Sequence, residues 1–174
     1  MDVKIVSPDD AYRLSKFYEA NESHLRAWEP TKEKGFHSVK AWKERLQDWC
    51  SPRGNAVSVR FISTMPEGGE VAATCSLTNI VRGPFMACHM GYSVDQKYEG
   101  KGVMKALCQN VINYAFEELS LNRVMANYMP RNHRSAKLLQ SLGFCIEGEV
   151  KRYLQINGVW EDHVLTSLLN PGNT

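Results

Sequence analysis

The sequence of 174 residues lacks several features that would place it in other classes of protein. It contains no apolar run of the roughly 20 residues that a membrane-spanning helix needs. Its start, Met1–Ile5, has no basic flank followed by a long apolar core, so we expect no signal peptide. The formal net charge is only +2, from 21 Lys and Arg against 19 Asp and Glu, which gives no reason to expect sequence-specific nucleic-acid binding. These absences favour a cytoplasmic protein without a membrane partner.

Cysteine and histidine are few and scattered. None of the five cysteines belongs to a C-x-x-C pair, so we expect neither a disulfide framework nor a zinc knuckle, and free thiols in a reducing compartment are the simpler interpretation. The five histidines show no H-E-x-x-H spacing. We therefore predict no metal site.

Apolar periodicity predicts one mixed α/β domain, and the length fits a single domain over residues 1–174. Helical spacing comes first, strand-like runs bounded by turn residues follow, and a strong helix comes next. The predicted helices are 7–18, a short piece from 23 to the break at Pro30, 38–49, 102–119 and 132–142. The predicted strands are an antiparallel meander of 56–62, 71–80 and 85–94, with its first turn at 66–69, then 123–129 and a hairpin of 144–154 and 159–169.

One stretch, 91–104, runs from a strand through a glycine-bearing loop into a helix. Glycines at such a junction let backbone N–H groups converge, and the helix N-terminus adds unpaired donors, so an anion site is predicted. A tight turn without a ligand fits the same residues. A P-loop would need Ser or Thr where Gly102 follows Lys101, and a dinucleotide fingerprint would need a glycine where Lys105 stands. The antiparallel meander also disagrees with a parallel dinucleotide-binding unit.

Two motifs carry a resemblance to a known family. Lys97-x-x-Gly100-x-Gly102 resembles the acyl-CoA pyrophosphate loop of the GCN5-related N-acetyltransferases (GNAT family), although that family usually begins the motif with Arg or Gln. Asn132-x-x-Ser135, followed by Leu142-Gly143-Phe144, resembles the family's N-x-x-S…L-G-F segment. The resemblance implies an N-acetyltransferase domain with acetyl-CoA as co-substrate. It also implies a mostly antiparallel mixed sheet of about seven strands flanked by helices.

Within this family the chain resembles most closely the Rim-type ribosomal-protein alanine N-acetyltransferases, particularly those acting on small-subunit protein S5. The resemblance implies transfer of acetyl to the N-terminal alanine of S5, with the ribosome or its precursor as a further partner, and it is compatible with an oligomer. The resembling stretches are His24-Leu25-Arg26-Ala27-Trp28-Glu29-Pro30, Asn79-Ile80-Val81-Arg82-Gly83, Met125-Ala126-Asn127-Tyr128-Met129-Pro130 and Trp160-Glu161-Asp162-His163-Val164-Leu165-Thr166.

The resemblance also implies roles for individual residues. Loop N–H groups from Tyr98 through Val103 would hold the pyrophosphate, and backbone groups of Ser93 and Val94 would pair with the pantetheine arm. The N–H of Val94 would polarise the thioester oxygen, and the side chain of Asn132 would bind the pantetheine. The implied cofactor-binding residues are Ser93, Val94, Lys97, Tyr98, Glu99, Gly100, Lys101, Gly102, Val103 and Asn132.

Catalysis by direct attack needs a group that protonates the departing sulfur and a base that accepts the amine proton. Ser135 is implied for the sulfur; without the resemblance it would be interpreted as a serine on a helix surface. Glu29 is our first candidate for the base and His89 our second, while Asp162 and His163 are further candidates. A structural role for each, or a water chain without a single base, fits the sequence as well.

Two other functions stay open at this point. The same chemistry could serve a small amine, such as a polyamine or an aminoglycoside, and a strongly acidic acceptor pocket would favour it. Alternatively, the chain could be a non-catalytic acyl-CoA-binding or ribosome-assembly module, which would bind acetyl-CoA without turnover.

Overall fold

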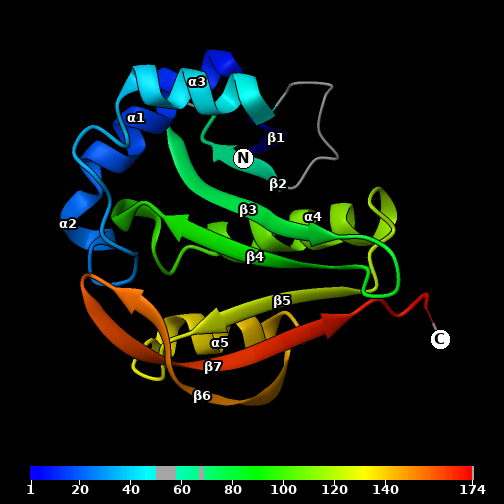
Figure 1. Ribbon diagram of the computed structural model, residues 1–174. Coiled ribbons are helices and arrows are strands. Elements are labelled where there is room, and N and C mark those ends of the chain that lie inside the picture. Colours follow the sequence, from blue (N-terminus) through cyan, green and yellow to red (C-terminus); the bar gives the residue numbers. More distant parts are fainter. Residues whose placement is uncertain (50–57, 67–68, 174) are drawn as a thin grey trace.

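A computed structural model describes residues 1–49, 58–66 and 69–173. Its centre is a seven-stranded sheet in the order β1-β2-β3-β4-β5-β7-β6 (Figure 1). All neighbouring strands are antiparallel except β4 and β5, which are parallel. The strands are β1 (Asp2–Ile5), β2 (Ser58–Thr64), β3 (Val71–Val81), β4 (Ala87–Val94), β5 (Arg123–Tyr128), β6 (Cys145–Ile156) and β7 (Val159–Leu169). The predicted fold class is confirmed.

The predicted meander is also present, as β2, β3 and β4. Strand β2 begins at Ser58, and residues 56–57 of the predicted strand lie outside the described residues, as does the centre of the predicted turn at 66–69. Strand β1 was not predicted. It has only four residues and pairs with β2 at the sheet edge, so its sequence offers too few alternations to indicate a strand.

The helices cover both faces of the sheet. Ser7 and Asp10 form a capping box at the start of the first helical segment. Helices α4 and α5 lie close to the predicted ranges. The helical elements are η1 (Pro8–Asp10), α1 (Ala11–Ala20), α2 (Glu22–Leu25), α3 (Val39–Trp49), η2 (Gln96–Tyr98), α4 (Val103–Glu117) and α5 (His133–Ser141).

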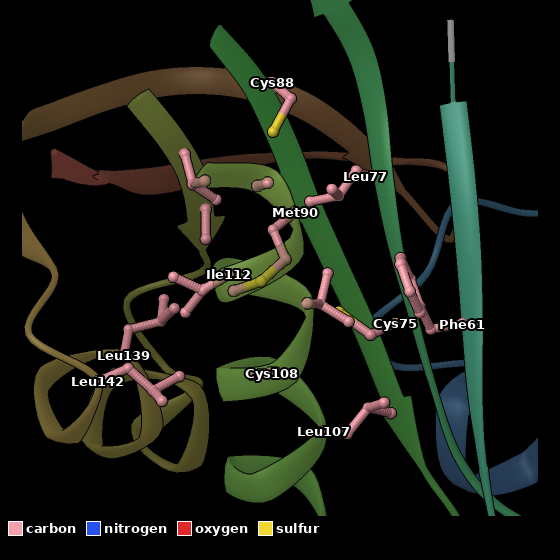
Figure 2. Packing of buried hydrophobic residues seen from close by; sticks show 14 of the residues in the cluster. Phe61, Cys75, Leu77, Cys88, Met90, Leu107, Cys108, Ile112, Leu139 and Leu142 are labelled. Atoms are coloured by element: carbon pink, nitrogen blue, oxygen red, sulfur yellow. The ribbon is translucent and has the colours of Figure 1, made fainter. Parts of the chain in front are cut away.

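Two apolar clusters fill the layers on either side of the sheet. Neighbouring residues of a strand point to opposite faces, and Phe61 of β2 belongs to the larger cluster while Ile62 belongs to the smaller one. The larger cluster joins the sheet to α4 and α5; Figure 2 shows Ile112 and Leu139 among its side chains. The smaller cluster joins the sheet to α1 and α3, with Trp42 at its centre.

Strands β4 and β5 pair over only three residues each. Their register runs from Ala87 opposite Arg123 to His89 opposite Met125 and stops there. Beyond this point the two strands separate towards their carboxyl ends, as Figure 1 shows. The separation leaves one side of β4 without a neighbouring strand in the middle of the sheet, and this is where the functional site forms.

Candidate active site

A cleft of about 1260 Å³ opens where β4 and β5 separate. Its walls come from β3, β4 and β5, the segment around α2, the start of α4 and the start of α5. It brings together most of the residues singled out from the sequence: Glu29, Ser93, Val94, Tyr98, Glu99, Gly100, Gly102, Asn132 and Ser135. His163 also lines the cleft, and five others lie outside its lining: His89, Lys97, Lys101, Val103 and Asp162.

The loop before α4 presents backbone donors to the cleft. Gly100 and Gly102 have φ angles of +69° and +78°, which favour glycine, and a Cβ built on either would have no heavy atom within 4 Å. The first hydrogen bond of α4 runs from Ala106 N to Gly102 O at 3.1 Å. The N–H groups of Val103 to Lys105 therefore have no carbonyl of the preceding turn to bind. Together with the positive end of the helix dipole, these N–H groups have the geometry that the predicted anion site requires.

Several predicted loop donors are directed elsewhere. The N–H groups of Tyr98, Glu99 and Lys101 donate within the loop, to the carbonyls of Asp95, Gln96 and Tyr98. The N–H of Lys97 donates to Asp95 Oδ1 at 2.8 Å, and its Nζ lies 3.6 Å from Glu70 Oε2 at the surface. The donors that can meet a phosphate are thus those of Gly100, Gly102 and the first turn of α4.

Strand β4 directs alternate backbone groups into the cleft. Just after β4, Asp95 N donates to Ala72 O of β3 at 2.9 Å. Because antiparallel hydrogen-bonded pairs alternate, Ser93 also directs its backbone groups to β3, while Tyr92 and Val94 direct theirs towards the gap beside β5. Val94 is therefore placed for its predicted role, whereas Ser93 offers the cleft its side chain.

Asn132, Ser135 and Tyr92 form a hydrogen-bonded unit across the cleft. Asn132 Oδ1 accepts from Ser135 N at 3.1 Å and caps α5. Ser135 is 8% exposed, and its Oγ lies 2.5 Å from the hydroxyl of Tyr92. Burial raises the pKa of Tyr92, so this hydroxyl keeps its proton near neutral pH. Sequence reasoning missed Tyr92, although strand alternation directs it to the face opposite Ser93, where α4 and α5 pack.

Glu29 lies at the other end of the cleft and is partly buried. Its Oε1 accepts from Ser93 Oγ at 3.0 Å. The adjacent Trp28 is 36% exposed, with the guanidinium of Arg131 5.2 Å from its ring. Glu99 links the two walls, because it pairs with both His24 and Arg134. Through His24, the segment that carries Trp28 and Glu29 is therefore connected to the glycine loop.

The other base candidates differ in position. His89 lies where the pairing of β4 with β5 ends; its Nδ1 is buried without a hydrogen-bond partner among the described residues, and burial lowers its pKa. Asp162 binds Lys151 Nζ and Arg152 N, both at 2.9 Å, on the β6–β7 hairpin and outside the cleft lining. His163 is buried in the cleft wall, with Nδ1 3.1 Å from Glu161 O.

The charges of the cleft lining are mostly positive. Two carboxylates line it, Glu29 and Glu99, and Glu99 is already paired with Arg134. The basic side chains are Arg60, Lys105, Arg131, Arg134 and Lys137. Such a cleft suits the phosphates of a nucleotide and lacks the acidic character expected of a polyamine pocket.

The part of the chain that the structure describes lacks a metal cluster, a disulfide and a membrane-spanning helix. Within it, no group of three or more His, Cys, Asp or Glu side chains could hold a metal ion. The described cysteines, Cys75, Cys88, Cys108 and Cys145, are free thiols. Among its helices, none combines the length and apolar character that crossing a membrane requires.

The chain is similar to acetyltransferases along nearly its whole length. Residues 4–145 match the acetyltransferase (GNAT) domain family. The chain is 39% identical to the ribosomal protein uS5-alanine N-acetyltransferase of Escherichia coli, over 97% of this chain and 87% of the relative. The structure of the ribosomal-protein-S5-alanine acetyltransferase from Vibrio fischeri has a TM-score of 0.93 and 40% identity, covering 97% of this chain and 92% of that one. The structure of Mycobacterium smegmatis RimJ in complex with CoA-disulfide has a TM-score of 0.89 and 26% identity, covering 98% of this chain and 82% of that one.

Proposed function

We propose that this chain, which belongs to the acetyltransferase (GNAT) family, transfers the acetyl group of acetyl-CoA to the N-terminal alanine of small-subunit ribosomal protein S5. The observation that carries this proposal is the 39% identity to the uS5-alanine enzyme of Escherichia coli, which covers 97% of this chain. Family membership and the glycine loop support the cofactor. The likeness over nearly the whole chain supports the acceptor.

Acetyl-CoA would lie along the wall formed by β4, α4 and α5. The N–H groups of Gly100, Gly102 and the first turn of α4 would bind its pyrophosphate, and Lys105 would add positive charge. The outward N–H and C=O groups of Val94 would pair with the pantetheine arm in the gap beside β5. The complex of the Mycobacterium smegmatis relative with CoA-disulfide supports CoA as the class of cofactor.

The chain's own groups would then move two protons. Glu29 would accept the proton of the acceptor amine, oriented by the hydroxyl of Ser93 at 3.0 Å. His89 is the second candidate for this step. The N–H of Val94 would stabilise the negative charge on the thioester oxygen during direct attack. Ser135, bonded to the Tyr92 hydroxyl, would supply a proton to the departing thiolate.

The charge of the cleft favours a peptide over a polyamine as the acceptor. A polyamine carries several positive charges, and a cleft with more basic than acidic side chains repels it. A peptide terminus presents one amine and a series of neutral peptide groups. The segment around Trp28 and the separated ends of β4 and β5 form an open groove that an extended peptide can enter.

The testing experiment measures acetyl-CoA consumption with three acceptors: an S5 N-terminal peptide starting with alanine, spermidine and an aminoglycoside. Preference for the alanine peptide is expected. Turnover on the small amines alone would agree with the acetyltransferase family but would contradict the ribosomal acceptor. Binding of acetyl-CoA with no turnover on any amine would contradict the enzymatic proposal altogether.

A further inference from the structure

One arginine lies on the floor of the acceptor half of the cleft. Arg60 of β2 pairs with Ser76 of β3, and Ser76 pairs with Gly91 of β4. Residues directly opposite each other share one face of a sheet, so these three form a row across it, and all three line the cleft. Because Ser76 is small and Gly91 has no side chain, this row leaves an open path from Arg60 to the end of β4 where the acetyl group would react.

The adjacent row carries the candidate base. Thr74 pairs with Ser93, whose hydroxyl donates to Glu29 Oε1 at 3.0 Å. Arg60 Nη1 donates to the Tyr18 hydroxyl at 2.9 Å, and that hydroxyl lies 3.4 Å from Thr74 Oγ1. A carboxylate and a guanidinium therefore lie over adjacent rows of the same sheet face. The carboxylate is bonded to Ser93, and the guanidinium is connected through Tyr18 to Thr74, the strand partner of Ser93.

The position of Arg60 is fixed by its surroundings. Its guanidinium lies 5.4 Å from the ring of Trp42, which is 2% exposed at the centre of the smaller apolar cluster. The Tyr18 ring packs against Trp42 as well, with centroids 5.5 Å apart. A cation held by an aromatic face and a hydrogen bond loses little further freedom when it binds a ligand.

A guanidinium in this place distinguishes between kinds of amine. A peptide terminus carries a carbonyl oxygen close to its amine, and a guanidinium has five N–H donors, so Arg60 can serve such an oxygen in addition to Tyr18. A lysine side chain or a polyamine has only methylene groups close to its amine, with no oxygen to accept a hydrogen bond. A nearby positive charge also disfavours the ammonium form of a bound amine, and only the neutral amine attacks a thioester.

We propose that Arg60 is a specificity-determining residue that selects the α-amino group of a peptide by donating a hydrogen bond to the first carbonyl oxygen of the acceptor. This inference rests on the proposed function. In the bound state the amine faces Glu29 and Ser93, while the first peptide bond extends over Ser76 and Gly91 towards Arg60. The chemical class thus selected is a peptide with a free N-terminus.

The test combines one variant with one altered substrate. Wild type and Arg60→Met are assayed with the alanine peptide and with its analogue in which an alkene replaces the first peptide bond, which removes the carbonyl oxygen. Arg60→Met keeps an apolar stem against Trp42. The control is Arg26→Met, because Arg26 is an exposed arginine in the turn after α2 and lies outside the cleft lining. Acetyl-CoA affinity and thermal unfolding are measured for each protein.

With wild type, the alkene analogue is expected to lower kcat/KM by about 10- to 100-fold, the range for a hydrogen bond to a charged group. With Arg60→Met the loss caused by the alkene should be clearly smaller than in wild type, acetyl-CoA affinity should be unchanged, and the preference for the alanine peptide over spermidine should narrow. An equal loss on every acceptor, or the same response to the alkene in both proteins, would overturn the role of Arg60. A wild type inactive on the alanine peptide but active on spermidine would instead overturn the proposed function.

Discussion

The two walls of the cleft are built in different ways. The cofactor wall uses main-chain groups: the glycine loop, the first turn of α4 and the free side of β4. It rests on the larger apolar cluster, where α4 and α5 pack on the sheet. The acceptor wall uses side chains from segments far apart in sequence, such as Glu29 with Ser93 and Tyr18 with Arg60, which are 64 and 42 residues apart.

This difference determines how each wall responds to mutation. A main-chain donor cannot be removed by exchanging its own side chain, so the main-chain donors of the cofactor wall are affected by changing backbone conformation or by filling the space in front of them. The acceptor wall depends on individual polar atoms, each of which one substitution removes. Substitutions on the cofactor wall should therefore act on acetyl-CoA affinity, and those on the acceptor wall on turnover and acceptor choice.

The largest effect is expected from Gly100→Val. The new side chain would occupy the space where phosphate meets the loop, and a φ of +69° strains any residue with a Cβ. Loss of two or more hydrogen bonds to a charged group should lower acetyl-CoA affinity on the order of 100-fold or more, as calorimetry would measure.

Gly158→Val is the matched control, since Gly158 has a φ of +82°, has open space around it, and lies in the β6–β7 turn outside the cleft lining. Both variants should lose about 1–2 kcal/mol of stability, because a residue with a Cβ is strained in the left-handed backbone conformation. Only Gly100→Val should lose affinity. Equal affinities in the two variants would remove the loop from cofactor binding.

The next largest effect is expected at the hydroxyls of Ser135 and Tyr92, which lie where the two walls meet. Ser135→Ala should lower kcat by about 10- to 100-fold, because the thiolate would leave without a proton donor, and should change acetyl-CoA affinity little. Tyr92→Phe should cause a smaller loss. The double variant should be no slower than Ser135→Ala, because Tyr92 would act only through Ser135. Pre-steady-state kinetics measures all three, and an unchanged kcat in Ser135→Ala would exclude this role.

The sequence predicted the cofactor wall better than the acceptor wall, for a physical reason. Gly100, Gly102 and the start of α4 are close in sequence, and their geometry follows from local backbone conformation. The Tyr92–Ser135 contact joins residues 43 apart, and the row from Arg60 to Gly91 depends on strand register, which no short motif encodes. Strand order beyond the meander and the short β1 likewise depend on packing of the whole chain.

A smaller effect is expected at the candidate base. Glu29→Gln keeps the shape of the side chain but cannot accept a full proton, so kcat/KM for the alanine peptide should fall about tenfold near pH 7. The loss should shrink above the α-amino pKa of about 7.7–8.0, where the amine is already neutral. His89→Gln is the comparison in the same pH series. A larger and equally pH-dependent loss in His89→Gln would reverse the order of the two candidates.

The smallest effect concerns the stability of the layer behind the acceptor wall. His37 stacks on Tyr18 with centroids 4.0 Å apart, and burial, followed by the charges of Arg45, Lys32 and Arg60, lowers its pKa from 6.5 to about 4. The unfolded chain therefore takes up a proton below about pH 6.5 that the folded chain accepts only near pH 4. Stability is retained above pH 6.5 and is lost as the pH falls from 6.5 towards 4.

Because His37 is only half-buried, its share of this loss should be on the order of 1–2 kcal/mol. Urea unfolding at pH 7.5 and pH 4.5 measures it in wild type and in His37→Phe, which keeps the ring on Tyr18 but has no proton to gain. The variant should lose less stability than wild type over this interval, with little change at pH 7.5. Parallel losses in the two proteins would show that other groups govern the acid sensitivity, and that the acceptor wall rests on its aromatic packing alone.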